Sequence, residues 1–222
     1  GFLAYQIYSA IFSPNTSFNN DEAFVYIPSD ATFSDVRINL EPLVKDMSTF
    51  EAVAERKGYV TNIKGGKFAL KKGMNNNEMI NSLRSKNIPV KVSFNNQESL
   101  SALAGRIAQQ IEADSVELVK SFNDAEFLES IGLNEDSKLG MYLPNTYEFF
   151  WNTNAKNFRD KMYKEYERFW NAERLKKAEE LDLSPSQVIA LAAIVQKETV
   201  KVEERPRVAG VYLNRVRKGI LL

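Results

Sequence analysis

The chain has 222 residues, 44% of them hydrophobic, and its 29 basic and 29 acidic residues give a formal net charge of zero. A chain of this length can form one large domain or two modest ones, and its balanced charge provides no general basic field to attract nucleic acid. Cysteine and histidine are both absent, which excludes disulfides, thiolate catalysis, histidine-dependent hydrolases and most zinc sites. An enzyme of this composition must move protons with carboxylates, lysines or hydroxyls, and we expect neither a metal nor a cofactor.

The opening segment, residues 1–12, is apolar but shorter than the roughly twenty residues that a membrane-spanning helix needs. It is either the stub of a membrane anchor or a helix that packs on the domain. Residues 15–21 are polar and turn-rich, as in a linker.

The next part of the chain alternates strand and helix signals. The predicted elements are a strand at 24–27, helices at 32–40 and 48–58, a strand at 65–70, a helix at 75–86 and a strand at 89–94. Capping-box patterns at Ser48 with Glu51 and at Asn75 with Glu78 mark two of the helix starts. The order strand, helix, helix, strand predicts a small α+β module.

From residue 96 onward the pattern is mainly helical. The predicted helices cover residues 96–111, 115–122, 124–131, 155–180, 184–199 and 204–218. Residues 134–154 lack helical periodicity and are rich in aromatic side chains. The fold class predicted for the whole chain is therefore α+β.

The helix at 184–199 contains the strongest candidate for chemistry. Ser184 and Gln187 form a capping box around Pro185, and an apolar stripe follows that we expect to face the core. Glu198 lies at the margin of this stripe, where a carboxylate is costly unless it is paired and tends to keep its proton. Glu198 is thus a candidate general acid. The alternative is a structural glutamate that forms a salt bridge with Lys201 or Arg205.

Three other segments are candidates for binding. In the loop at 140–147, aromatic residues alternate with small polar groups, a mixture that stacks on sugar rings and hydrogen-bonds to hydroxyls. The alternative is an aromatic cluster that covers the core. The charged turn at 203–207 and the pair Asn214-Arg215 are also explained by helix capping, local ion pairs and surface positions.

Taken together, these segments resemble the YceG-like (MltG) endolytic murein transglycosylases. The similarity is carried by Leu191–Thr199, by Glu204-Arg205, by Val208–Arg215 and by the loop Tyr142–Tyr147. Residues 24–93 are similar to the LysM-like subdomain of that family.

The resemblance implies a fold of two parts and a position at the cell envelope. Residues 1–20 would be a juxtamembrane stub and linker, 21–93 a LysM-like module, and 94–222 the N-terminal part of a mainly helical, lysozyme-like catalytic domain. The protein would be a single-pass protein of the bacterial inner membrane, with its globular part on the periplasmic or extracytoplasmic side. Glycan strands of peptidoglycan would be its substrate, and cell-wall synthases are candidate partners; nucleic acid is not expected.

The resemblance also implies the residues of the site. Glu198, the glutamate before Thr199, would be catalytic. Many members carry a second glutamate two positions earlier, where this chain has Gln196, so Gln196 is at most a helper. The remaining residues expected to contact substrate are Tyr142, Asn145, Thr146, Tyr147, Gln196, Glu204, Arg205, Asn214 and Arg215.

The implied reaction is cleavage of the bond between N-acetylmuramic acid and N-acetylglucosamine in nascent strands, which leaves 1,6-anhydro ends. One carboxyl group suffices, because the C6 hydroxyl of the substrate replaces water. Two alternatives stay open: a non-catalytic peptidoglycan-binding module, and a lysozyme-type hydrolase with Glu203 or Glu204 as second carboxylate. Family members continue beyond Leu222, so we expect this chain, as a C-terminally incomplete catalytic domain, to show weak activity or none.

Overall fold

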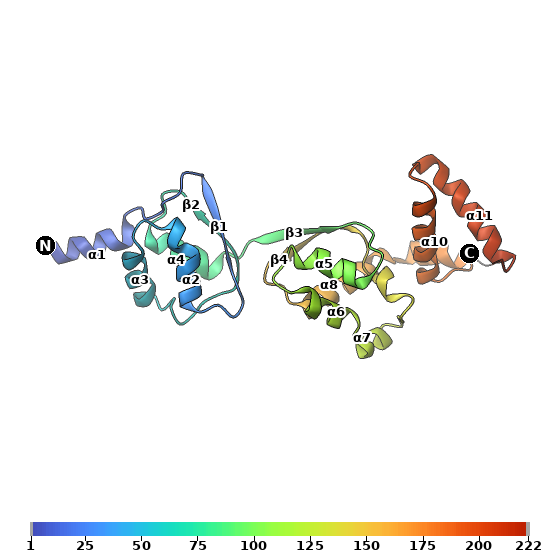
Figure 1. The fold of residues 1–222 in the computed structure, drawn as a ribbon, viewed down its shortest axis with the longest axis horizontal. Coiled ribbons are helices and arrows are strands. Elements are labelled where there is room, and N and C mark those ends of the chain that lie inside the picture. Colours follow the sequence, from blue (N-terminus) through green and yellow to red (C-terminus); the bar gives the residue numbers. More distant parts are fainter. Residues whose placement is uncertain (1, 221–222) are drawn as a thin grey trace. The chain divides into compact units, whose positions relative to one another are not determined.

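The computed structural model describes residues 2–220 and confirms the α+β class (Figure 1). Gly1, Leu221 and Leu222, the outermost residues of the predicted stub and catalytic segment, lie outside the described residues. Packing divides the chain into two compact units: a first unit of Gly1–Val119 with Pro144–Phe158, and a second unit of Lys120–Leu143 with Arg159–Leu222. The boundary predicted between residues 93 and 94 lies inside a strand of the first unit. The two packing units therefore do not coincide with the functional domains 21–93 and 94–222, which stay a prediction.

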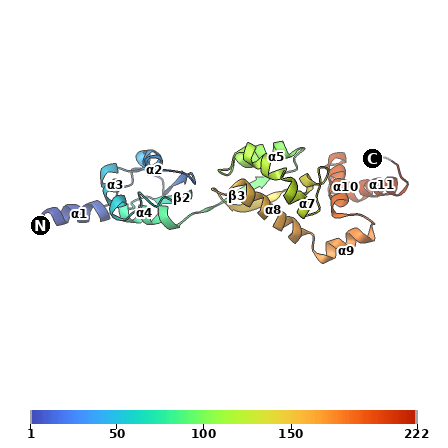
Figure 2. The same cartoon turned by 90° about the horizontal axis from the view of Figure 1, so that it is seen from below.

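The first unit contains the predicted strand-helix-helix-strand module. Its elements are α1 (Phe2–Phe12), β1 (Glu22–Ile27), α2 (Phe33–Leu40), the short 3-10 turn η1 (Glu41–Leu43), α3 (Met47–Arg56), β2 (Gly66–Lys71) and α4 (Asn76–Ser85). β1 pairs antiparallel with β2, and Val25 is opposite Phe68. In Figure 2, α2 lies on one side of this module and α4 on the other. Within residues 2–220, no helix has the length and hydropathy needed to cross a bilayer.

Caps set the helix starts in this module, mostly as the sequence predicts. Asn75 and Glu78 form the predicted capping box of α4. The predicted cap of α3 at Ser48 is wrong, because Asp46 is the N-cap and its Oδ1 accepts a hydrogen bond from the Thr49 amide at 3.2 Å. Ser48 lies in the first turn, where its hydroxyl donates to the same Asp46 oxygen at 2.7 Å. Gly58, with φ of +65°, takes the left-handed conformation that follows the end of α3.

A hydrophobic core holds the module together. It includes the large side chains of Phe50, Tyr59, Phe68, Met79, Ile80 and Leu83. Two asparagines are buried beside it: Asn15 Nδ2 donates to Asn76 Oδ1 at 2.8 Å, and Asn76 Nδ2 donates to the carbonyl of Ala10 at 2.7 Å. These bonds tie the end of α1 to α4, so α1 is attached to the module through satisfied polar groups.

The rest of the first unit is built on a second strand pair. β3 (Pro89–Phe94) pairs antiparallel with β4 (Asn145–Phe150), with Val92 opposite Tyr147. The sequence predicts β3 but leaves residues 145–150 without an element, because Asn145, Thr146 and Glu148 interrupt their apolar pattern. Helix α5 (Leu100–Ala108) contributes the predicted buried face at Leu100, Leu103, Ala104 and Ile107.

The second unit is mainly helical. Its elements are the end of α6 (Ser115–Phe122), α7 (Ala125–Ser130), the 3-10 turn η2 (Lys138–Met141), most of α8 (Ala155–Phe169), α9 (Ala172–Glu180), α10 (Pro185–Glu198), the 3-10 turn η3 (Val202–Glu204) and α11 (Arg205–Arg217). The single long helix predicted at 155–180 is wrong. The chain breaks at Trp170, which is buried, and Asn171 caps the new helix α9 by accepting from the Arg174 amide at 3.0 Å.

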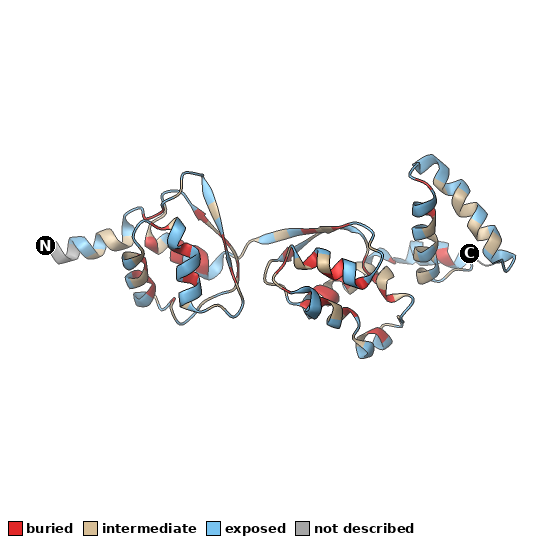
Figure 3. Cartoon of the chain, viewed as in Figure 1, coloured by how far each residue is buried: buried red, intermediate tan, exposed pale blue. Residues whose placement is uncertain are grey.

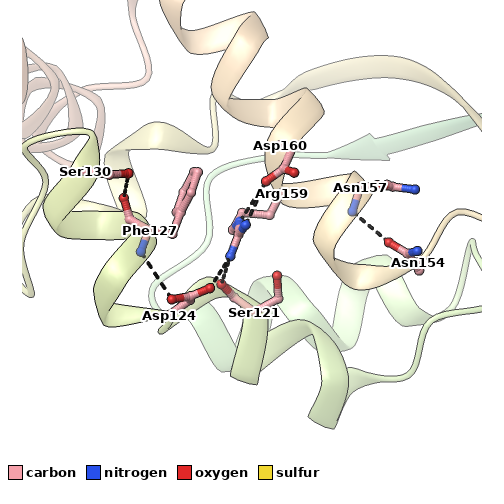
Figure 4. Close-up of polar contacts among 8 residues, drawn as sticks. All are labelled: Ser121, Asp124, Phe127, Ser130, Asn154, Asn157, Arg159 and Asp160. Atoms are coloured by element: carbon pink, nitrogen blue, oxygen red, sulfur yellow. Dashed lines mark hydrogen bonds and ion pairs between the residues drawn. The ribbon is translucent and has the colours of Figure 1, made fainter.

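A buried arginine joins three helices of the second unit (Figure 4). The guanidinium of Arg159, on α8, donates to Asp160 Oδ1 and to Asp124 Oδ2, each at 2.8 Å through a terminal nitrogen. It also donates to the carbonyl of Ser121 near the end of α6 at 3.4 Å, and its Cζ lies 3.8 Å from the centroid of the Phe127 ring. Its side chain is only 5% exposed, so removing it leaves two carboxylates and a carbonyl without their donor.

We predict that Arg159→Ala destabilises the protein by about 3 kcal/mol, because it breaks a buried charge pair from one side. The measurement is the free energy of unfolding by urea. The control is Arg168→Ala on the same helix: Arg168 is 74% exposed and pairs with Glu165, so its loss should cost under about 0.5 kcal/mol. Equal effects of the two substitutions would contradict the role of Arg159.

The same cluster predicts a dependence of stability on pH. The amide of Phe127, and then the Arg159 guanidinium, hold the pKa of Asp124 below its usual range. A lowered carboxyl pKa in the folded state stabilises the fold above the pKa of the unfolded chain, and this contribution is lost as the pH falls through the folded value. Asp124→Asn keeps an oxygen for the cap but carries no charge. We expect Asp124→Asn to be less stable than the parent at pH 7 and equal to it well below about pH 4, when melting temperatures are compared across that range.

Candidate active site

The helix that carries Glu198 forms as predicted but is less buried than predicted. Ser184 and Gln187 form the capping box of α10, with Pro185 at the first position. Of the expected core-facing stripe, Val195 and Thr199 are buried, Val188 and Leu191 are half-buried, and Ala192 is exposed. Figure 3 shows the same difference, with red residues frequent in α4 and α5 and scarce in α10 and α11.

One close contact fixes the buried side of α10 in the second unit. Gly140 in η2 faces Ile189, and a Cβ at Gly140 would lie 3.1 Å from Ile189 Cγ2. A larger residue at 140 would therefore require the Ile189 side chain to shift, so the glycine allows the close approach of α10 to η2.

Glu198 is the last residue of α10 and is exposed to solvent. The hydroxyl of Tyr212, on α11, donates a hydrogen bond to its carboxylate. Arg215 lies one turn further along α11, with its Cζ 5.8 Å from the centroid of the Tyr212 ring. The contact of α10 with α11 thus brings a carboxylate, a phenol and a guanidinium together.

The residues after Glu198 hold the connection between the two helices. The buried Thr199 donates from its hydroxyl to Glu204 Oε2 at 2.8 Å and accepts from the Lys201 amide at 3.1 Å. Lys201 Nζ lies 3.3 Å from Glu204 Oε1. Lys201, considered as a salt-bridge partner of Glu198, thus pairs with Glu204 instead.

The other predicted residues of the second unit differ in their exposure. Arg205 is half-buried, and its Nε is buried without a hydrogen-bond partner among the described residues. Gln196 and Asn214 are exposed. Tyr142 is buried against Phe122, with ring centroids 4.5 Å apart, and burial raises the pKa of its hydroxyl. The ring of Tyr142 is therefore part of the interior of the second unit.

The remaining residues of the loop belong to the first unit. Tyr147 stacks on Phe94 across the strand pair, with ring centroids 5.9 Å apart. Asn145 and Thr146 are exposed at the start of β4, beside Arg106, and line an open hollow of about 710 Å³. The predicted loop is thus divided between the two units at residues 143 and 144.

Sequence reasoning missed Tyr212 as a partner of Glu198. Its only signal in the sequence is its spacing, three residues before Arg215 on one face of the last helix. The contact with Glu198 depends on how α10 and α11 pair, which the sequence pattern does not give. In the part of the chain that the structure describes, no group of three or more acidic side chains could hold a metal ion.

The contact between Glu198 and Tyr212 can be tested by titration. The hydrogen bond to Glu198, with smaller contributions from burial and from the charge of Glu198, raises the pKa of Tyr212, while Arg215 opposes the shift. We predict that Glu198→Gln lowers the Tyr212 pKa towards its usual value of about 10, followed by NMR of labelled tyrosine. Glu203→Gln is the matched control and should leave the Tyr212 pKa unchanged. An unchanged Tyr212 pKa in Glu198→Gln would show that the two groups do not interact.

Comparison with known proteins connects this helical pair to a family. A crystal structure of a yceG-like protein (lmo1499) from Listeria monocytogenes matches with a TM-score of 0.55 and 23% sequence identity, over 91% of this chain and 72% of that chain. This likeness supports a shared fold. No curated protein matches the chain. The model of the YceG-like family matches residues 25–222, nearly the whole chain, and the chain therefore belongs to the YceG-like family.

Proposed function

We propose that the protein is an endolytic lytic transglycosylase that cleaves peptidoglycan glycan strands, with Glu198 as its catalytic residue. The observation that carries the proposal is the exposed carboxylate of Glu198 at the end of α10, hydrogen-bonded by Tyr212. Membership of the YceG-like family supports a murein transglycosylase role. An exposed acid suits a polymeric substrate, which must reach the catalytic group from solvent along its length.

The proposed reaction needs one carboxyl group. Protonated Glu198 gives its proton to the glycosidic oxygen as the bond from this oxygen to C1 of N-acetylmuramic acid breaks. The Glu198 carboxylate then takes the proton of the C6 hydroxyl of the same sugar, whose oxygen bonds to C1 and closes the 1,6-anhydro ring. No water is consumed, and Glu198 ends protonated as it began.

The neighbours of Glu198 have positioning roles in this proposal. Tyr212 holds one carboxylate oxygen, which directs the other towards the scissile bond. Glu204 is bound by Thr199 and Lys201, an arrangement that suits a structural role better than that of a second catalytic carboxylate. Gln196, Arg205, Asn214 and Arg215 belong to the same helical pair and are proposed substrate contacts, as are Asn145, Thr146 and Tyr147 of the first unit. The ring of Tyr142 is buried, so Tyr142 is not proposed as a direct contact.

The location and partners belong to the same proposal. The exposed aromatic side chains of α1, Tyr5, Tyr8 and Phe12, suit a segment beside a lipid surface, as expected for the outer end of an inner-membrane anchor. The globular part would then face the extracytoplasmic cell wall, where residues 21–93 act as a LysM-like module and residues 94–222 belong to the lysozyme-like catalytic domain. Cell-wall synthases that produce nascent strands are the proposed partners.

The experiment is digestion of purified glycan strands by the full-length protein, followed by mass spectrometry of the products. We predict 1,6-anhydro ends and a loss of rate by a factor of about 10² to 10⁴ in Glu198→Gln, the range expected for removal of a general acid and base. Glu203→Gln, at an exposed glutamate nearby, is the matched control and should keep the parent rate.

Each other outcome points to a different function. Products heavier by one water, with activity lost in Glu203→Gln or Glu204→Gln, indicate a lysozyme-type hydrolase. Strands that bind without being cut indicate a non-catalytic peptidoglycan-binding module. Full activity in Glu198→Gln would show that the catalytic assignment is wrong.

A further inference from the structure

The second unit contains a pocket away from Glu198. It has a volume of about 630 Å³ and lies between α8, the start of α9, the segment 131–137 and the first turn of α10. Pockets that bind small molecules and sugar units are usually about 300 to 1,000 Å³. Ser184 and Pro185 at the start of α10 form part of its wall, whereas Glu198 ends the same helix.

Aromatic side chains form one wall of this pocket. Tyr163 and Tyr166 of α8 and the following Trp170 recur at i, i+3 and i+7, so they share one face of the helix. The two tyrosines are half-buried, which leaves part of each ring open to a ligand. Leu175 lies on the rim and is 44% exposed. Flat aromatic rings of this kind present apolar faces with a polar edge.

The polar lining is uncharged except for one carboxylate. It consists of Asn134, Ser137, Ser184, Ser186 and Glu167. The hydroxyl of Tyr163 donates to Glu167. Among the described residues, no lysine or arginine lines the pocket, so a phosphate or another anion would find no cationic partner there. Hydroxyl, amide and carboxylate groups instead match a neutral ligand that offers hydroxyls and amides.

The indole of Trp170 is a buried part of this wall. Trp170 is 9% exposed, and its Nε1 has no hydrogen-bond partner among the described residues. Tyr166 Oη lies near both the indole and the hydroxyl of Ser186. Buried N–H groups almost always have a partner, and the nearby Tyr166 oxygen is available to this one, so the indole reports on a ligand that moves the Tyr166 ring.

We propose that this pocket binds one N-acetylhexosamine unit of a glycan strand, with its ring against the tyrosines of the wall that also contains Trp170. The proposal rests on the proposed function, which supplies the glycan. It adds a second point of attachment: α10 spans fourteen residues, so its two ends are about 20 Å apart at a rise of about 1.5 Å per residue. A strand held at the pocket would reach Glu198 several sugars away, which would set the length of the released piece.

The test uses the indole signals of the protein in two-dimensional NMR. The chain has two tryptophans; Trp151 belongs to the first unit and Trp170 to the pocket. On titration with N-acetylglucosamine tetrasaccharide, we expect the Trp170 indole signal to shift and saturate, and the Trp151 signal to stay in place. A Trp170 signal that does not move in excess tetrasaccharide would overturn the proposal.

Variants distinguish the pocket from the catalytic group. Tyr166→Ala should weaken the binding seen at Trp170 about tenfold, equivalent to about 1.4 kcal/mol, while Tyr8→Ala in the first unit should not change it. If Tyr166→Ala does not fold, two variants at exposed leucines replace this comparison. Leu175→Ala, on the rim of the pocket, is the test, and Leu181→Ala, outside the pocket, is its control. Equal affinities within the pair would also overturn the proposal.

Glu198→Gln separates the failure of this inference from the failure of the proposed function. It should bind the tetrasaccharide at Trp170 as the parent does. Binding at Trp170 by a protein that cleaves no glycan would support the pocket and contradict the proposed function. Cleavage of glycan without a response at Trp170 would support the proposed function and contradict the pocket.

Discussion

The second unit depends on the burial of one charged side chain. Arg159 carries a guanidinium that is almost fully enclosed, and burying a charge is costly unless it is paired and hydrogen-bonded. Its partners come from the end of α6, the cap of α7 and its own helix. The observed packing of the three helices satisfies this group, and the segments that lead to η2 and then α10 start from that packing.

The candidate active site lies where burial is lowest. All residues of α11 are described and none is buried, and in α10 only Val195 is. The pair is held by local contacts, among them the bonds of Thr199 and Glu204 and the close approach of Ile189 to Gly140. The buried cluster around Arg159 and the exposed helical pair that presents Glu198 are thus separate parts of this unit.

Much of the fold could be predicted from the sequence, because its signals are local. Two examples are the capping boxes at Asn75 and Ser184, and a third is the apolar face of α5. Each depends on residues that lie a few positions apart in the sequence. The break at Trp170 was missed because charged residues on both sides continue a helical pattern, while burial of the indole and the cap by Asn171 decide the outcome. The strand β4 was missed because its stability comes from pairing with β3, far away in the chain.

The candidate site shows the same limit. Glu198 could be identified from its place in α10 and from the family resemblance. Its exposure to solvent could not be predicted, because the apolar stripe beside it predicted more buried residues than α10 has. Tyr212 could not be connected to Glu198 without the packing of α10 on α11. Tyr142 and Tyr147 are neighbours in the sequence, yet one packs in the second unit and the other in the first.

The pairing of β3 with β4 has a consequence for synthesis on the ribosome. The βααβ module is complete once α4 has emerged, whereas β3 must wait for all of residues 95–144 before its partner strand appears. During that interval β3 is an unpaired edge, which is open to mispairing with other chains. Pro89 and Lys91 in β3 are residue types that disfavour pairing of an edge strand with other chains. They would reduce mispairing of the nascent chain until β4 has been synthesised.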